Sequence, residues 1–125
     1  MMHPEIFVAK TEHKGWGVFT KSNIAADTVV EISPVVVMTQ DERKLIDQTI
    51  LYNYIFEWDN EQCCMAMGLI PIYNHAYSSN CEYFQDYDEG TIFIKTVRDI
   101  KAGEELCINY NGDWDNNKEV WFEVK

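Results

Sequence analysis

The chain has no Cys-x-x-Cys pair, although it contains four cysteines. Cys63 and Cys64 are adjacent, whereas Cys81 and Cys107 stand far from them and from each other. This spacing is wrong for a structural zinc site, in which closely spaced pairs of ligands meet at one ion. We therefore predict no metal and expect buried, reduced thiols, as is usual for an intracellular protein.

Long apolar runs are missing as well. No segment approaches the roughly 20 apolar residues that a membrane-spanning helix needs. Residues 1–5 lead directly into an amphipathic segment, without the apolar stretch of a secretory signal. Together these absences predict an intracellular protein with no membrane partner, cytoplasmic or, if it acts in a host cell, nuclear.

Basic residues are scarce: 10 Lys and Arg stand against 21 Asp and Glu, which gives a net charge of −11. Phosphate binding needs clustered Lys and Arg, so nucleic acid is not expected as a direct partner. The negative charge suits a basic ligand, such as a Lys-rich peptide attracted by the field of the protein. Solubility alone is a sufficient explanation for most of these acidic residues.

Repeats, linkers and low-complexity segments are absent too. We expect one domain over residues 1–125, with a core of about 6–114 and an acidic, aromatic tail at 115–125. Short runs of β-branched and aromatic residues between turns predict a mainly β fold of several small sheets with short helices. Ser33-Pro34 is expected to separate two of the strands. The expected strands cover residues 6–10, 16–20, 28–32, 35–38, 54–58, 63–67, 81–87, 91–97 and 106–110.

One longer helix is predicted over residues 40–53. Thr39 followed by Glu42 is a capping-box pattern, which marks the start of a helix. The apolar residues that follow recur at helical spacing and predict a buried stripe. Its members on or near the buried side are Leu45, Ile46, Ile50 and Leu51.

Three short segments carry polar groups suited to a cofactor held beside a reacting amine. Gly15-Trp16-Gly17 would let a ligand approach the backbone closely, although glycines around an aromatic residue also mark ordinary turns. Asn74-His75 opens the segment NHAYSSNC, and such a pair can equally tie two loops together. Tyr110 ends the segment GEELCINY, and a tyrosine that ends an apolar strand is commonly a packing residue.

In their order and spacing, these segments resemble the SET-domain family of protein-lysine methyltransferases, in its compact stand-alone form. The family pattern is close to NHSCxPNC, of which this chain keeps Asn74, His75, Asn80 and Cys81. It departs at positions 76, 77 and 79, and none of these changes removes a catalytic group. The resemblance extends over residues 6–114. It implies the SET fold, in which the Asn-His segment threads beneath a C-terminal loop in a knot-like arrangement.

The resemblance also implies roles for single residues. Tyr110 would be catalytic, and Tyr54 and Trp16 would line the channel that admits the substrate lysine. The methyl group would pass to the ε-amine of a lysine in a basic protein tail, such as a histone, and leave S-adenosylhomocysteine. The donor, S-adenosylmethionine, would be bound by Gly15, Trp16, Gly17, Asn74, His75 and Trp114.

The implied chemistry needs a neutral amine. Lysine has a solution pKa of about 10.4, so at neutral pH it is charged and not nucleophilic. A dry channel would lower this pKa, and the Tyr110 hydroxyl would orient the amine. No cysteine follows Cys107, so the cysteine-rich segment of larger family members is missing. The tail, or a second subunit in a homodimer, would then complete the site.

Two other classes of protein remain open. The first is a catalytically silent SET-like module that binds a peptide or the donor without turnover. The retention of Asn74, His75 and Tyr110 together argues against this interpretation. The second is a generic acidic, β-rich interaction domain, which explains the charge but not the ordered motifs.

Overall fold

The computed structural model describes residues 1–111. The predicted tail at 115–125 and the predicted donor-binding residue Trp114 lie outside this part of the chain. The described residues form two sheets, so the predicted mainly β fold is confirmed. In this part of the chain, no helix is both long and apolar enough to cross a membrane.

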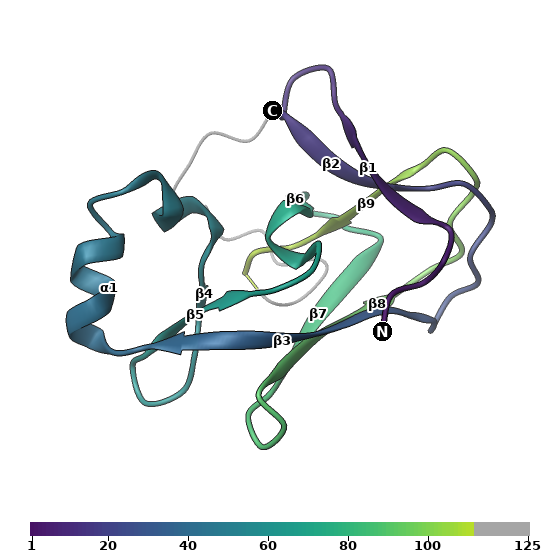
Figure 1. Ribbon diagram of the computed structural model, residues 1–125. Coiled ribbons are helices and arrows are strands. Elements are labelled where there is room, and N and C mark those ends of the chain that lie inside the picture. The colour runs from purple at the N-terminus through teal and green to yellow at the C-terminus, as the bar shows by residue number, and fades with distance from the viewer. Residues whose placement is uncertain (112–125) are drawn as a thin grey trace.

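The smaller sheet brings the two ends of the described chain together. Its strand order is β1 (Ile6–Lys10), β2 (Trp16–Thr20), β9 (Glu105–Ile108) and β6 (Asn74–His75). The first three strands pair antiparallel, whereas β6 and β9 pair parallel. Figure 1 shows β9 between β2 and the short β6. The glycine turn and the Asn-His pair therefore belong to one sheet. The knot-like threading stays a prediction, because the chain after residue 111 is not described.

The larger sheet contains the hairpins that the sequence predicted. Its strand order is β4 (Phe56–Glu57), β5 (Cys63–Ala66), β3 (Val29–Met38), β8 (Thr91–Thr96) and β7 (Cys81–Asp86). The hydrophobic core draws side chains from both sheets, among them Val18, Val30, Ile92, Ile94, Leu106 and Ile108, and it includes Tyr73, which lies just before β6. All four cysteines are free and buried, as expected.

The predicted break between two strands at Ser33-Pro34 is wrong, because β3 continues through it. The first half of β3 pairs with β8 as far as Pro34, and its second half pairs with β5 from Val35 onward. Proline cannot donate to a ladder, and here it stands where one ladder ends and the next begins. The change of partner lets the strand run on.

The predicted helix over 40–53 is divided in two. The helix α1 (Gln40–Ile46) begins with the predicted capping box at Thr39, and a short 3-10 helix, η1 (Ile50–Tyr54), follows. Thr49 caps this second segment, because its side chain accepts a hydrogen bond from the Leu51 N–H. Asp47 and Thr49, which lie between the two segments, are weak helix formers and favour a stop at this point.

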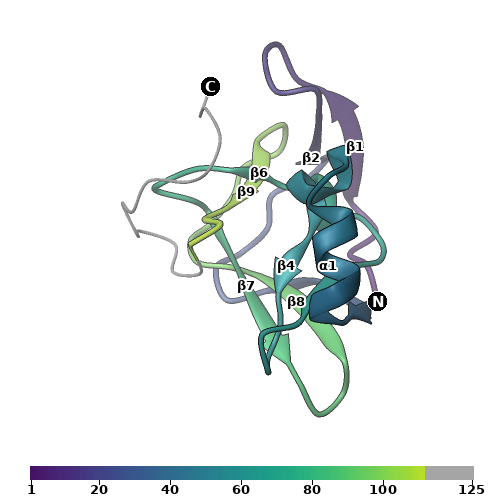
Figure 2. The same cartoon turned by 90° about the vertical axis from the view of Figure 1, so that its left-hand side faces the viewer.

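The predicted buried stripe on this helix is wrong. Leu45 is 67% exposed and Ile50 is 72% exposed, and α1 has no buried residue. Figure 1 places α1 at the opposite end of the molecule from β1 and β2, and in Figure 2 it faces the viewer. Polar contacts attach it instead, including a two-pronged ion pair from Arg43 to Glu57 at 2.6 and 2.7 Å.

Two of the expected strands differ from the observed ones by more than one residue at an end. The expected strand at 54–58 is only Phe56–Glu57, because Tyr54 still belongs to η1. The expected strand at 106–110 is β9, which ends at Ile108. Tyr110 therefore follows the strand rather than ending it.

Candidate active site

The parallel pairing of β6 with β9 places the predicted site residues side by side. Asn74 lies opposite Cys107, and His75 lies opposite Ile108. Asn80 reinforces this contact: its Oδ1 accepts from the Cys107 N–H at 2.9 Å, and its Nδ2 donates to the Glu105 carbonyl at 2.8 Å. Residues about 30 positions apart in the chain thereby share one small surface.

Asn74 connects this surface to the glycine turn. Its Nδ2 donates to the Trp16 carbonyl at 3.0 Å and to the Glu105 carboxylate at 2.7 Å. Both partners are acceptors, which fixes the side of the carboxamide that carries the nitrogen. No residue in the range 1–111 donates a hydrogen bond to the Asn74 Oδ1. This oxygen is oriented by the other end of its own amide and can accept from a ligand.

Glycine is needed at two positions of the turn for different structural reasons. Gly15 has a φ of +73°, a left-handed conformation that side chains rarely adopt. Gly17 is needed for space: a Cβ there would lie 2.5 Å from the Glu105 Oε2 and 3.1 Å from the Asn74 Nδ2. The backbone of β2 can therefore lie against Asn74 only because Gly17 has no side chain.

Glu105 is a site residue that sequence reasoning did not assign. Its side chain is 16% exposed, and its carboxylate contacts the Lys14 Nζ at 3.0 Å as well as the Asn74 amide. It lies at the start of β9, inside the motif that ends in Tyr110. The signal that could have found it is a carboxylate at the entry of an otherwise apolar strand.

His75 places the backbone of Tyr110. Its Nδ1 accepts from the Tyr110 N–H at 2.9 Å, and its ring is 4% exposed and packs edge-on against Tyr77 at 4.5 Å. Burial lowers the pKa of His75 below its ordinary value, which favours the neutral ring that this acceptor role requires. His75 thus connects the Asn-His pair to the predicted catalytic residue.

The Tyr110 hydroxyl is held in the interior of the protein. It donates to the Tyr73 carbonyl at 2.6 Å. Burial raises the pKa of Tyr110 above its usual value, and the nearby thiol of Cys107 and phenol of Tyr54 act in the same direction. The phenol is therefore neutral at physiological pH. Such a group can orient a substrate through hydrogen bonds, but it is a poor base.

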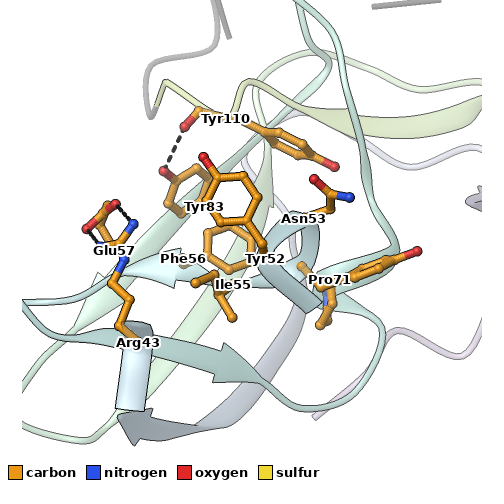
Figure 3. A pocket seen from close by; sticks show the side chains of 10 residues that line it. Arg43, Tyr52, Asn53, Ile55, Phe56, Glu57, Pro71, Tyr83 and Tyr110 are labelled. Carbon is orange, nitrogen blue, oxygen red and sulfur yellow. Dashed lines mark hydrogen bonds and ion pairs between the residues drawn. The ribbon is translucent and has the colours of Figure 1, made fainter. Parts of the chain in front are cut away.

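Tyr110 and Tyr54 line the same cavity, which has a volume of about 100 Å³ (Figure 3). The Tyr83 hydroxyl donates to the Tyr110 carbonyl at 3.3 Å. The Arg43–Glu57 ion pair lies at another part of the wall. Much of the remaining wall is aromatic or apolar and consists of Tyr52, Ile55, Phe56, Pro71 and Tyr83. The sequence did not identify these residues as part of the site.

Trp16 was predicted for both the donor site and the channel. The structure places its carbonyl on Asn74, while its ring is 54% exposed and lies below the Lys10 ammonium at 5.3 Å. It is not among the residues that line the cavity with Tyr110. Within residues 1–111, then, the predicted donor and channel residues form two neighbouring groups. Asn74, His75 and Tyr110 connect them.

Comparison with known proteins identifies the family of this chain. The SET-domain pattern matches residues 15–111. A histone-lysine N-methyltransferase of Schizosaccharomyces pombe, specific for H3 lysine-37, is 38% identical over 117 residues, which cover 93% of this chain and 76% of that protein. A histone-lysine N-methyltransferase of Cryptococcus neoformans, specific for H3 lysine-36, is 32% identical over 122 residues, which cover 89% of this chain but 14% of that protein.

The fold has its own counterpart among solved structures. The crystal structure of a Plasmodium falciparum protein described as a histone methyltransferase matches with a TM-score of 0.70, at 22% identity. The match covers 90% of this chain and 98% of the other. The chain therefore belongs to the SET-domain family, and it is a protein-lysine N-methyltransferase, as the ordered motifs predicted.

Proposed function

We propose that this protein transfers a methyl group from S-adenosylmethionine to the ε-amine of a histone lysine, with Tyr110 as the catalytic residue. The observation that carries the proposal is the position of the Tyr110 hydroxyl. It is anchored at 2.6 Å on the Tyr73 carbonyl, at the wall of an aromatic cavity. The next two residues after Tyr73 are the predicted donor-binding pair.

The residues present fit the donor. Glycine at position 17 lets the Asn74 and Glu105 side chains lie against the backbone of β2, and the Asn74 amide is fixed with its oxygen available. We propose that Gly15, Trp16, Gly17, Asn74 and His75 hold the donor, together with Trp114 from outside the described residues. When bound, the donor supplies an electrophilic methyl group on a positively charged sulfur.

We propose that this cavity admits the substrate lysine. Its tyrosines and Phe56 would strip water from the ammonium group, which lowers the pKa of the amine and favours the neutral, nucleophilic form. The neutral Tyr110 hydroxyl would then hold the amine in line for attack. Alignment in a dry, preorganised site supplies most of the rate in this scheme, and no strong base is needed.

Histone is the proposed substrate class for two reasons. The S. pombe and C. neoformans relatives carry H3 lysine specificity in their names. The net charge of −11 also attracts a basic tail and disfavours direct contact with nucleic acid. We accordingly propose that the protein acts inside the cell, where histones are found.

We further propose that the protein forms a homodimer through the exposed apolar side of α1 and η1. Leu45, Ile50 and Leu51 are 67%, 72% and 42% exposed on neighbouring segments. Light scattering at several protein concentrations measures the oligomeric state. A monomer at every concentration contradicts this part of the proposal.

The principal experiment incubates the purified chain with radiolabelled donor and core histones. Transfer of label to histone lysine is expected, and calorimetry should show donor binding in the absence of histone. Donor binding without transfer would identify a catalytically silent module instead. If the chain shows neither donor binding nor methyl transfer, only the interaction-domain interpretation remains.

A further inference from the structure

A buried carboxylate is connected to the proposed catalytic hydroxyl of Tyr110 through one intervening residue, Tyr73. Glu31, on β3, is 0% exposed and forms no ion pair with any Lys, Arg or His of residues 1–111. Burial of a carboxylate without a cation is costly unless hydrogen bonds satisfy its oxygens. Neither the motifs nor the donor and lysine sites described above use this residue.

Hydrogen-bond donors surround the carboxylate. The Ser33 hydroxyl and the Leu69 N–H both donate to its Oε2 at 2.8 Å, and the Tyr73 hydroxyl donates to its Oε1 at 3.1 Å. Burial raises the pKa of the Glu31 carboxyl above its usual value, and these donors oppose that rise. Gly68 leaves room for the arrangement, because a Cβ there would lie 2.3 Å from the Glu31 Oε2.

Tyr73 joins this carboxylate to Tyr110. The Tyr73 side chain is fully buried, and its hydroxyl is fixed on Glu31. Its backbone carbonyl accepts the Tyr110 hydroxyl at 2.6 Å. The same residue is thus anchored at the far end of its ring and supports the proposed catalytic group with its own peptide. The next residue, Asn74, enters the pairing with β9, which holds the Tyr73 peptide from its other side.

We infer that Glu31 is a positioning residue, which fixes the direction of the Tyr110 hydroxyl through Tyr73. The inference rests on the proposed catalytic role of Tyr110. Loss of the Glu31 contact lets the Tyr73 ring and its peptide shift, and the carbonyl that holds Tyr110 moves with them. A misplacement of about 1 Å in a reacting group can cost about 100-fold in rate. Donor binding, which depends on the glycine turn and Asn74, is not the step that this contact serves.

The test is a set of double-mutant cycles on the full chain. Glu31→Gln and Tyr73→Phe are each made alone and together with Tyr110→Phe, and kcat, KM and donor affinity are measured with core histones. Alone, each variant should lower kcat by about tenfold or more and leave donor affinity within about twofold. In the Tyr110→Phe background, neither should lower the residual kcat further, because the hydroxyl that they position is already gone.

A matched control separates positioning from general loss of structure. Thr96 is also fully buried on a strand, where its hydroxyl accepts from the Thr28 N–H at 2.9 Å and donates to the Ala25 carbonyl at 2.8 Å. Thr96→Val should lower thermal stability and leave kcat unchanged. If Glu31→Gln does not fold, Tyr73→Phe decides, since it removes one hydroxyl and keeps the ring.

The outcomes distinguish this inference from the proposed function. Full turnover in Tyr110→Phe overturns the catalytic role of Tyr110 itself. Loss of turnover in Tyr110→Phe, with normal kcat in Glu31→Gln or, if that variant does not fold, in Tyr73→Phe, overturns only the positioning role. An equal fractional loss of kcat in both backgrounds also overturns it, because it shows that the contact supports the fold as a whole.

Discussion

The backbone N–H of Tyr110 donates to the Nδ1 of His75 at 2.9 Å. This bond joins the two sequence motifs that lie 35 positions apart, and it requires an imidazole with an unprotonated Nδ1. A charged imidazole has a proton on both nitrogens and cannot accept. The histidine of the Asn-His pair therefore contributes to the position of Tyr110 only while it is neutral.

The first prediction follows from this requirement. The pKa of His75 is lower in the folded protein than in the unfolded chain, because burial disfavours its charged form. Its contribution to stability is therefore fully present above the unfolded pKa of about 6.5 and is lost as the pH falls through the lower, folded value. Thermal melts from pH 7.5 to 5 should show a decline in wild type that is smaller in His75→Gln.

The comparison with His75→Gln isolates this one group. Glutamine offers a carbonyl oxygen for the Tyr110 N–H but does not titrate. His3 and His13 remain in both proteins and cancel in the difference. Parallel stability curves for the two proteins over this pH range would show that His75 does not titrate with folding.

Much of the fold could be predicted from the sequence, because most strands are defined by local signals. Turns that contain glycine or acidic residues connect the strands of the hairpins. The apolar runs between these turns predict strands, whichever strands they pair with. The segment over 40–54 could not be predicted in the same way. Its helical periodicity is real, but Leu45 and Ile50 stay 67% and 72% exposed. Periodicity indicates a face of a helix, not what covers it.

The candidate site, like the fold, could be predicted from the sequence only in part. The motifs identified Asn74, His75 and Tyr110 as neighbours in function, and the pairing of β6 with β9 brings them together. Glu31 and Glu105 were missed, since each acquires its role from a contact far along the chain. Glu31 meets Tyr73 across 42 positions, and Glu105 meets Asn74 across 31. A carboxylate at the entry of an apolar strand, as at Glu105, marks a candidate site residue but does not show which distant residue it meets.

The second prediction concerns donor binding. Asn74→Ala should weaken the affinity for S-adenosylmethionine by about 1–3 kcal/mol, the cost of leaving a buried polar partner unsatisfied. In this variant the Glu105 carboxylate and the Trp16 carbonyl each lose a hydrogen bond from Asn74. Titration calorimetry with the donor alone measures the change.

The matched control for this variant is Asn23→Ala. The Asn23 side chain is likewise hydrogen-bonded to the backbone, since its Oδ1 accepts from the Ala102 N–H at 2.9 Å, but it lies in a loop outside the proposed site. It should leave donor affinity unchanged. Equal affinities for wild type and a folded Asn74→Ala would move the donor site elsewhere.

The third prediction concerns the pH dependence of turnover. Activity should rise from about pH 7 towards pH 9, because the target amine must be neutral and has a solution pKa of about 10.4. The rise in activity does not come from ionisation of Tyr110, because burial raises the pKa of Tyr110 well above this pH range. Single-turnover rates isolate the chemical step. A flat profile in that experiment would contradict a free amine as the nucleophile.

The last prediction separates the two tyrosines of the cavity. Tyr110→Phe should fold normally and keep donor affinity, since it loses one hydroxyl and retains its ring. Its kcat should fall by about 10² to 10³, the usual effect of removing a hydrogen-bonding group that acts mainly in the transition state. Tyr54→Phe should spare the first methyl transfer. It should change the number of methyl groups added, because the cavity gains room beside the amine. Mass spectrometry of the methylated histone reads both results at once. Full activity in Tyr110→Phe together with an inactive Tyr54→Phe would reverse the assignment of the catalytic tyrosine.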